Sequence, residues 1–490
     1  MKTIYRGRRS ALLFLPPAFL FVLLFLLCRA YTVDDAFITY TYCKHILTGQ
    51  GPVFTPGQYT EGFTSPLHVL LLLAAANSAH LVLAAKVIGC VSGLLLLAYV
   101  YRSAGLLTAL LLTAVPAFAI CAANGLETML YALLLTIFLL TRFWRPQPLL
   151  GQVAMVLLVW VRPEGIALVL FALALDLWAR RSPARLLRDV LLAAGAFLLL
   201  LGLRYHIYGQ WLPNTYYAKA AAGSILGRAG HGLVYLLKGH IKLLFIPLVL
   251  VCYRLFHLPA DPARRRRIIC LFLCLAGYLA IVVYEGGDWI PFDRFLVPIL
   301  PVYFVLAFAG RPASRGVALL ALVLVLCQAP VGLYEFGYVR DRAKGYSHAH
   351  RYLARFLDSR QPAPLVALMD IGMVAFYSDC RVIDLMGLTD RHIARARPFS
   401  PDYVLKQQPD YVVLVASRSY ARGFASPFAR DRLLYRHPLF AGRYAFLFER
   451  NHFLYINSNQ VIRTVRKLFA PLSSEAGFAG YFLLVFARLP

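Results

Sequence analysis

The sequence has little charge, and acidic residues are especially scarce. Charged side chains make up 15% of the 490 residues, with 23 Asp and Glu against 50 Lys and Arg, whereas hydrophobic residues make up 60%. Soluble domains are about 45–50% apolar and about 25% charged, so a soluble globular protein and a disordered chain are both excluded. The long uncharged runs predict a polytopic α-helical membrane protein.

Cysteine is scattered, and several common signatures are missing. The nine Cys show no zinc-site spacing, and the chain has no sustained heptads, no GxGxxG or phosphate-loop motif and no internal repeat. A disulfide-rich scaffold and a coiled coil are therefore excluded. Seven Cys lie in or beside predicted membrane spans, which leaves Cys43 and Cys380 as the one candidate disulfide pair.

Apolar runs and loop charges together predict the membrane topology. Eleven spans are expected, with a retained first helix after the basic residues 1–10 and a cytoplasmic N-terminus. Pro66–Ala76 is too short to span and is predicted to be a re-entrant or interfacial helix. The basic clusters then fall in cytoplasmic loops, so membrane orientation accounts for the net charge of +27 and no nucleic-acid partner is expected. The predicted spans are at about residues 11–28, 81–101, 104–122, 126–141, 147–161, 165–178, 189–203, 240–256, 267–284, 294–309 and 316–334.

The last third of the chain has a different pattern. Its apolar runs shorten to strand length, and a helix is predicted over His348–Asp358. We therefore expect a transmembrane module over residues 1–334 and a small extracytoplasmic α/β domain over residues 335–490. With 22 basic and 12 acidic residues, this domain either faces an anionic partner or has a solvated basic surface. The predicted strands are at residues 364–369, 411–416, 444–448 and 479–487.

The predicted topology places every dense polar cluster on the extracytoplasmic side. Ionisable groups near the membrane usually mark a functional cavity. The acidic pair Asp34-Asp35 in the outer loop 29–80 is the sharpest of these clusters. Adjacent carboxylates raise one pKa, so one of them is a candidate base, whereas the alternative is that Asp35 caps a helix over residues 36–47. Both roles are expected, with one carboxylate capping and the other available for chemistry.

Basic residues in these clusters are candidates for binding a phosphate. Arg162 lies at the outer end of a predicted span and either holds a phosphate or pairs with Glu127 or Glu164. Lys219 is a second candidate, and the alternative for it is a snorkelling lysine at the interface. Further candidates in the same outer loop are Arg204 and His206 for the phosphate and Asn214, Tyr216 and Tyr217 for the substrate.

A last polar cluster precedes the predicted span 294–309. Its carboxylates and Arg294 are candidates for binding sugar hydroxyls, and its Trp is a candidate for stacking on a sugar or lining lipid. Acidic residues from the first and last outer loops are also candidates for holding a divalent cation such as Mg²⁺, Mn²⁺ or Ca²⁺. The candidate substrate-binding residues are Glu61, Glu127, Glu164, Glu285, Asp288, Trp289 and Arg294.

The ordered set of motifs resembles the GT-C superfamily of lipid-linked glycosyltransferases, and within it the bacterial terminal β-(1→2)-arabinofuranosyltransferases and their Gram-negative relatives. The segment Met369–Asp390 also resembles the outer domain of those relatives. The motifs are Val-Asp34-Asp35-Ala-Phe-Ile-Thr-Tyr, Glu61-Gly-Phe-Thr-Ser-Pro, Asn-Gly-Leu-Glu127-Thr, Val-Arg162-Pro-Glu-Gly, Pro-Asn214-Thr-Tyr-Tyr-Ala-Lys219 and Gly-Gly-Asp288-Trp-Ile-Pro-Phe-Asp-Arg294-Phe.

The resemblance implies a GT-C fold in a bacterial inner membrane, with an acidic residue of the first outer loop, Asp34, at the catalytic centre and Asp35 beside it. It also implies a polyprenyl-phosphate pentofuranose donor, such as decaprenyl-phosphoryl arabinofuranose, and membership of a group described as retaining configuration. The acceptor is expected to be a surface glycan or a protein. We expect Arg162 and Lys219 to hold the lipid phosphate. Asp34 is expected to orient or deprotonate the acceptor hydroxyl, to stabilise oxocarbenium character or, if configuration is retained, to attack the anomeric carbon. Asp35 is expected to tune the pKa of Asp34 or to hold a cation.

A non-enzymatic alternative is a GT-C-like scaffold or an assembly factor for a surface machine. A transporter is disfavoured, because transporters carry ionisable residues near the midplane of several spans and the spans predicted here are nearly free of charge.

Overall fold

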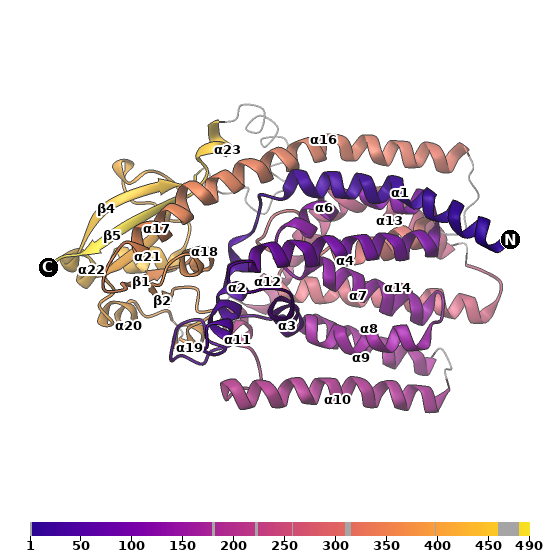
Figure 1. Cartoon of the computed structure of the whole chain (residues 1–490), viewed down its shortest axis with the longest axis horizontal. Helices are drawn as coiled ribbons and strands as arrows, with labels where there is room; N and C mark the ends of the chain where they lie inside the picture. Colours follow the sequence, from indigo (N-terminus) through magenta and orange to yellow (C-terminus); the bar gives the residue numbers. More distant parts are fainter. Residues whose placement is uncertain are drawn as a thin grey trace.

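Long apolar helices lie side by side along the long axis of the molecule, and a sheet with short helices closes one end (Figure 1). The computed structural model describes residues 2–178, 182–220, 224–256, 258–308, 315–396, 398–458 and 480–490. The N-terminus lies at the end of the bundle far from the sheet, and the C-terminus lies at the outer end of the sheet. The chain therefore starts at one end of the molecule and finishes at the other.

Uncharged aliphatic runs form the helices of the bundle. In chain order they are α1 (Lys2–Cys28), α4 (Leu81–Ala104), α5 (Leu106–Thr113), α6 (Pro116–Ala123), α7 (Thr128–Phe143), α8 (Pro148–Val161), α9 (Pro163–Trp178), α10 (Pro183–Tyr208), α12 (Ile225–Gly239), η1 (His240–Leu244), α13 (Phe245–Phe256), α14 (Pro262–Glu285), η2 (Val297–Ile299), α15 (Leu300–Phe308) and α16 (Arg315–Tyr346).

Several helices have the length and composition of membrane spans. Among the described residues, α4, α10, α14 and the stretch Ala321–Asp358 qualify by these two criteria alone, and the bent pair α5 and α6 adds a fifth. Shorter apolar helices, among them α7 and α8, have 10 to 17 residues. The α-helical membrane class is confirmed, whereas the count of eleven spans and the cytoplasmic N-terminus stay predictions.

Two of the predicted spans are interrupted. Residues 104–122 form two helices that meet at 68°. Pro116 disfavours the helical conformation at the residue before it, and Val115 is extended there (φ −78°, ψ 115°). The predicted span 294–309 becomes helical only from Val297, because the preceding residues belong to a loop that lines the site described below.

Helix α16 carries the chain from the bundle to the sheet without a break (Figure 1). It continues through η3 (Ser347–Arg351) into α17 (Tyr352–Asp358). The boundary expected between residues 334 and 335 therefore falls inside a helix rather than in a linker. The composition becomes polar at that point, but the helical path continues.

The sheet has five strands in the order β2, β1, β3, β5 and β4. β1 (Leu365–Leu368) pairs in parallel with β2 (Arg381–Asp384) and β3 (Tyr411–Ala416), whereas β5 (Phe482–Arg488) pairs antiparallel with β3 and β4 (Tyr444–Asn451). The four predicted strands are confirmed as β1, β3, β4 and β5. The short helices around the sheet are α18 (Ile371–Phe376), α19 (Arg391–Arg395), α20 (Pro401–Lys406), η4 (Tyr420–Arg422), α21 (Ala429–Tyr435), α22 (Pro438–Arg443) and α23 (Leu454–Ser458).

Three short helices, α2 (Asp34–Leu47), α3 (Pro66–Ala75) and α11 (Asn214–Ala220), belong to the connections between the long helices. α2 packs on α18 of the sheet region, where the Phe37 ring lies 5.4 Å from the ring of Phe376. Cys43 and Cys380 are both free thiols, so the candidate disulfide is not formed. The Cys43 thiol instead lies 4.0 Å from the carbonyl oxygen of Val69 in α3.

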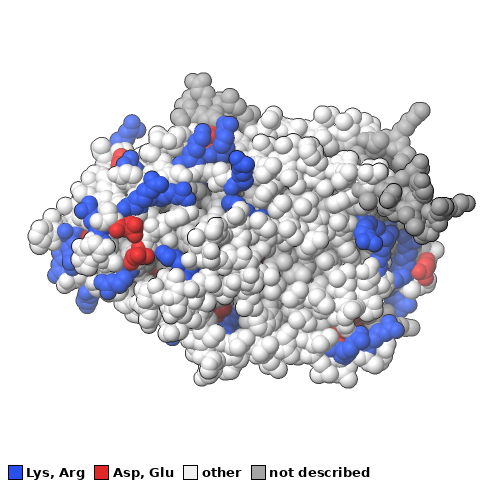
Figure 2. Space-filling model, in the orientation of Figure 1, with Lys and Arg blue, Asp and Glu red and all other residues white. Residues whose placement is uncertain are grey.

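Charge is distributed unevenly over the surface. Figure 2 shows a broad band with few charges across the bundle, between the sheet region and a basic cluster at the far end. Helix α14 carries Arg264–Arg267 in its first two turns and ends at Glu285, 24 residues in all. A helix of this length spans about 36 Å, which is enough to cross the hydrocarbon core of a bilayer.

Candidate active site

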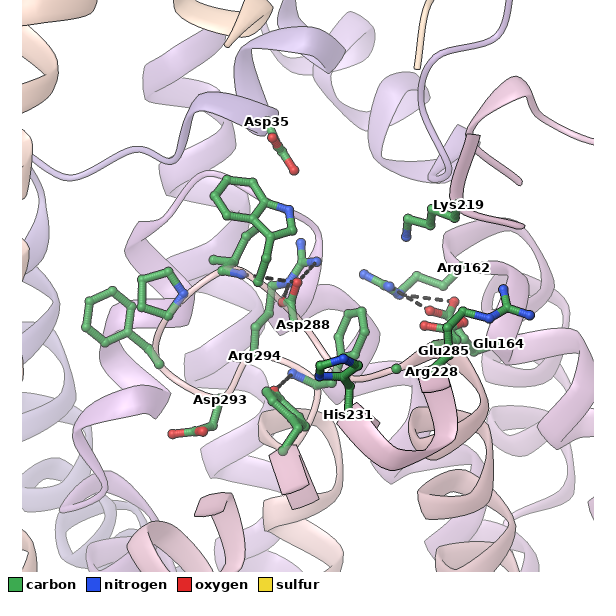
Figure 3. Close-up of a pocket in the computed structure, with 18 of the residues that line it drawn as sticks. Asp35, Arg162, Glu164, Lys219, Arg228, His231, Glu285, Asp288, Asp293 and Arg294 are labelled. Carbon is green, nitrogen blue, oxygen red and sulfur yellow. Dashed lines mark hydrogen bonds and ion pairs between the residues drawn. The ribbon is translucent and has the colours of Figure 1, made fainter. Parts of the chain in front are cut away.

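A cavity of about 750 Å³ lies where α9, α11, α12, α14 and α16 meet, below α2 (Figure 3). Acidic and basic side chains from segments far apart in the sequence line this cavity. These acidic and basic residues are Asp35, Arg162, Glu164, Lys219, Arg228, His231, Lys238, Lys242, Glu285, Asp288, Asp293, Arg294 and Glu335. This concentration of charge at one end of an apolar bundle makes the cavity the candidate active site.

Asp35 projects into the cavity from the first turn of α2 (Figure 3). Burial raises the pKa of this carboxyl group to about 7; Asp34 and Asp288 add to the rise, and Arg294 and Lys219 oppose it. A carboxylate with a pKa near neutrality is suited to accept a proton from a hydroxyl group at physiological pH.

The raised pKa of Asp35 predicts the pH dependence of a reaction in which Asp35 is the base. Below a pH of about 7 the carboxyl group is protonated and cannot accept a proton, so kcat/KM should fall about tenfold for each pH unit below that value. Above it, kcat/KM should level off. A kcat/KM profile from pH 5 to 9 checks this, and a profile that is flat from pH 5 to 8 would rule out titration of Asp35 as the controlling step.

Asp34, the other residue of the acidic pair, does not line the cavity and instead binds α18, which lies beside the sheet. Its carboxylate accepts hydrogen bonds from the backbone N–H groups of Gly372 (3.0 Å) and Met373 (2.7 Å) at the start of α18. The side chain is 5% exposed. Burial raises the pKa of Asp34, whereas His350 and the two N–H groups lower it. The expected side-chain cap on the helix over residues 36–47 is not formed, because α2 begins at Asp34 and the residue before it is Val33. Asp34 instead caps α18, and Asp35 faces the cavity.

Gly372 allows the close approach of α18 to α2. A Cβ atom at this position would lie 2.0 Å from the carbonyl oxygen of Asp34, so Gly372→Ala must push the two helices apart. We expect a loss of about 1–3 kcal/mol in the free energy of unfolding. Thermal unfolding in detergent measures it, with Gly442→Ala in α22 as control, because no atom lies within 4 Å of a Cβ there. Equal melting temperatures for the two variants would contradict the prediction.

Arg162 is held on three sides by carboxylates. Its Nη1 donates to Glu127 (2.6 Å), and its Nη2 and Nε donate to the two oxygens of Glu164 (2.7 and 3.2 Å). The guanidinium also lies 5.1 Å from the centre of the Phe295 ring. The side chain is 7% exposed. Of the two alternatives for this residue, the pairing with Glu127 and Glu164 is therefore present.

Three further ion pairs join side chains that line the cavity. Arg294 donates to both oxygens of Asp288 (2.6 and 3.2 Å). Lys242 lies 2.5 Å from carboxylate oxygens of both Asp293 and Glu335. Together with the pair of Arg162 and Glu164, these ion pairs neutralise most of the carboxylates that line the cavity. Among the described residues, the lining carboxylates with no ion-pair partner are those of Asp35 and Glu285.

The loop between α14 and η2 adopts backbone conformations that few residues tolerate. Gly286 and Gly287 have φ of +88° and +77°, and a Cβ on Gly287 would lie 2.7 Å from the side chain of Tyr235. Phe292 and Asp293 also have positive φ, +77° and +51°. Strained backbone of this kind clusters at functional sites. Here it aims Asp288, Asp293 and Arg294 at the cavity.

Lys219 faces the cavity from the end of α11 (Figure 3). No ion pair joins its amine to a carboxylate within the described part of the chain. Tyr216, one turn earlier, also lines the cavity and is half exposed. Glu285 lies beside Glu164, and Trp289 lines the cavity as well.

The remaining predicted residues lie outside the cavity lining. The guanidinium of Arg204 pairs with the carboxylate of Glu61, so neither Arg204 nor Glu61 is available to a ligand there. The exposed His206 lies on the same helix as Arg204.

Two of the predicted substrate residues of α11 contact the sheet region. Asn214 donates to the carbonyl oxygens of Gly387 (2.8 Å) and Leu388 (3.1 Å), and thereby attaches α11 to the sheet region. Glu127 does not line the cavity, and its carboxylate accepts a hydrogen bond from Arg162. The ring of Tyr217 lies under the guanidinium of Arg395, 4.4 Å from the ring centre.

The cationic face of α12 was not predicted from the sequence. Arg228, His231, Tyr235 and Lys238 of α12 and Lys242 of the following η1 all line the cavity. Their spacing of three, four, three and four residues places them on one helix face, and this period was the available signal.

The acidic side chains do not gather into a metal site. Within the described residues, no three His, Cys, Asp or Glu side chains lie close enough to share an ion. Asp288 and Asp293 are each engaged by a cationic side chain. A divalent cation therefore stays a prediction from the sequence, and no step is assigned to one.

The fold has a counterpart among solved structures. ArnT from Cupriavidus metallidurans in the apo state superposes with a TM-score of 0.50 at 14% identity, over 85% of this chain and 94% of that one. The same protein bound to undecaprenyl phosphate superposes with a TM-score of 0.46 at 17% identity, over 81% of this chain and 80% of that one. The superposition on the apo structure shows that this chain has the fold of ArnT.

A curated relative adds a similarity in sequence. The terminal β-(1→2)-arabinofuranosyltransferase of Mycobacterium tuberculosis is 30% identical over 262 residues, which are 45% of this chain and 40% of that protein. The match therefore spans about two fifths of the length of the curated relative. Residues 338–462 also match a family described as a domain of unknown function (DUF8728).

Proposed function

We propose that the protein is a membrane glycosyltransferase that moves a sugar from a polyprenyl-phosphate donor to a hydroxyl group of an envelope glycan or protein. The similarity to an arabinofuranosyltransferase supports a pentofuranose such as arabinofuranose as the sugar. Undecaprenyl phosphate, the ligand in one ArnT structure, is a lipid phosphate of the proposed kind.

The observation that carries the proposal is the presence in one cavity of Asp35 and Lys219. The carboxyl group has a raised pKa and suits proton transfer, and the amine has no ion-pair partner among the described residues and suits an anion. Figure 3 shows both side chains facing the same space. Transfer from a phosphate leaving group to a hydroxyl group requires a base and an anion-binding cation that face the same cavity.

The proposed reaction is a displacement at the anomeric carbon. The acceptor hydroxyl gives its proton to Asp35 as its oxygen bonds to the anomeric carbon, and the bond from that carbon to the phosphate oxygen breaks with its electron pair. Lys219 stabilises the negative charge that the phosphate gains. Arg162, which is fully engaged by Glu127 and Glu164, shapes the site instead of clamping the phosphate.

The cavity is proposed to face the extracytoplasmic side of a bacterial inner membrane. The end of the bundle far from the cavity is strongly basic, as the positive-inside rule expects of cytoplasmic loops (Figure 2). The sheet region then lies outside the membrane. In this orientation, Asp35 and Lys219 would bind a sugar donor that is already linked to a polyprenyl phosphate in the membrane.

Sugar transfer from synthetic polyprenyl-phosphoryl arabinofuranose by the purified protein tests the proposal. We expect wild type to release polyprenyl phosphate and to form a glycoside on an added acceptor or on water, and Asp35→Asn to do neither. The anomeric configuration of the product separates a single displacement, which inverts, from attack by a carboxylate, which retains. No turnover with any pentose donor would favour the scaffold alternative or another sugar.

A further inference from the structure

Helix α12 has two chemically different faces. Arg228, His231, Tyr235 and Lys238 line the cavity. The other side carries exposed aliphatic residues, and Val234, which also lines the cavity, is 53% exposed at the edge between the two faces. This arrangement places a cationic surface and a surface suited to lipid chains on one helix. The exposed aliphatic residues are Ile225, Leu226, Leu233, Val234 and Leu237 in α12, followed by Ile241 in η1.

The cations of α12 differ from the next cation along the chain in their pairing. Lys242 of η1 is neutralised by Asp293 and Glu335. By contrast, within the described residues, no carboxylate pairs with Arg228, His231 or Lys238, and the buried Nε of Arg228 has no hydrogen-bond partner. Unpaired cations beside an apolar membrane region are costly, so a ligand that supplies negative charge there is favoured.

We infer that α12 is the helix that binds the lipid phosphate, with Arg228 and Lys238 on either side of the phosphate and the prenyl chain along the aliphatic edge at Val234 and Leu237. The inference rests on the proposed function and specifies which residues of the cavity receive the donor. Arg228 and Lys238 are ten residues apart, about 15 Å along the helix axis, so the two long side chains reach toward a group bound midway between them, about 7.5 Å from each along the axis.

The charge change in the reaction matches this assignment. The donor is a phosphodiester with one negative charge, whereas the released polyprenyl phosphate is a monoester that carries between one and a half and two charges at pH 7. Cations without protein partners gain interaction energy as that second charge develops. The α12 cations therefore favour bond cleavage as well as binding.

Binding of radiolabelled undecaprenyl phosphate to the full-length protein in nanodiscs tests the inference, with undecaprenol and inorganic phosphate as parallel probes. We expect Arg228→Ala and Lys238→Ala each to weaken undecaprenyl phosphate binding on the order of tenfold, about the effect of one charge-assisted hydrogen bond. Lys238→Arg should retain most of the affinity. Lys406→Ala, in exposed α20 of the sheet region, should bind like wild type.

The outcomes separate this inference from the proposed function. Unchanged affinity in both α12 variants at unchanged melting temperature would overturn the assignment to α12, even where wild type transfers sugar. Equal affinity for undecaprenol would overturn the role of the cations, and equal affinity for inorganic phosphate would overturn the role of the prenyl chain. Phosphate-dependent lipid binding that both variants weaken would support the α12 site even if no pentose were transferred, in which case the proposed function alone would fail.

Discussion

Replacing Asp35 with Asn should lower kcat/KM for sugar transfer about 10²–10⁴-fold, the contribution of a positioned general base. The amide keeps the size of the side chain but cannot accept a proton. Asp35 is only partly buried and forms no ion pair among the described residues, so the variant should unfold at nearly the same temperature as wild type. Radiolabelled transfer assays across the pH range measure the loss, and the dependence on pH around 7 should disappear with it.

Asp34→Asn is the matched control because it makes the same chemical change one residue away. An amide oxygen accepts from the N–H groups of Gly372 and Met373 more weakly than a carboxylate, and its NH₂ group has no acceptor there. We expect a lower melting temperature and a smaller loss of activity that keeps the wild-type pH profile. The reverse pattern, with Asp34→Asn inactive at full stability and Asp35→Asn active, would return the catalytic role to Asp34, as the family resemblance implies.

Replacing Arg162 with Ala should cost about 3–5 kcal/mol of unfolding free energy. The change leaves Glu127 and Glu164 buried at membrane depth without the cation that neutralises both. Unfolding in detergent, followed by melting temperature and denaturant titration, measures the cost. Arg188→Ala is the control, because that guanidinium is 53% exposed and lies 3.8 Å from Asp189.

A second substitution separates structure from ligand binding at Arg162. Combining Arg162→Ala with Glu127→Gln and Glu164→Gln removes the unpaired charges and should recover a large part of the lost stability. If Arg162 instead clamped the donor phosphate, Arg162→Ala would keep its melting temperature and lose affinity for undecaprenyl phosphate. That result would contradict the structural role assigned here.

Much of the fold follows from local sequence signals. The strands β1, β3, β4 and β5 were predictable because each is a short apolar run of strand length. β2 was missed because Arg381–Asp384 has only four residues and two of them are charged. Pro116 marks the place of the bend between α5 and α6 in the sequence. A hydrophobic run does not indicate, however, whether a proline ends a helix or is accommodated inside it. Pro330, which lies inside α16, shows the other outcome.

The site was predictable as a set of residues but not as a set of contacts. Asp35, Lys219 and Arg294 were all found in polar clusters, and they line one cavity. Which of two neighbouring carboxylates faces that cavity depends on α18, more than 330 residues further along the chain, and no local pattern contains that information. Arg204 pairs with Glu61 across 143 residues of sequence, and this contact makes a candidate phosphate ligand part of a structural ion pair.

Strand β5 determines which fragments of this protein can be produced alone. The matched family region ends at residue 462, yet residues 482–488 lie between β3 and β4 and supply all the strand pairing of β4. A fragment cut to residues 338–462 would leave β4 detached and β3 with an open edge, and would also remove the α2 carboxylate that caps α18. Recombinant work on the sheet region should therefore keep the C-terminus through Arg488 and start upstream of α16, with the membrane helices attached.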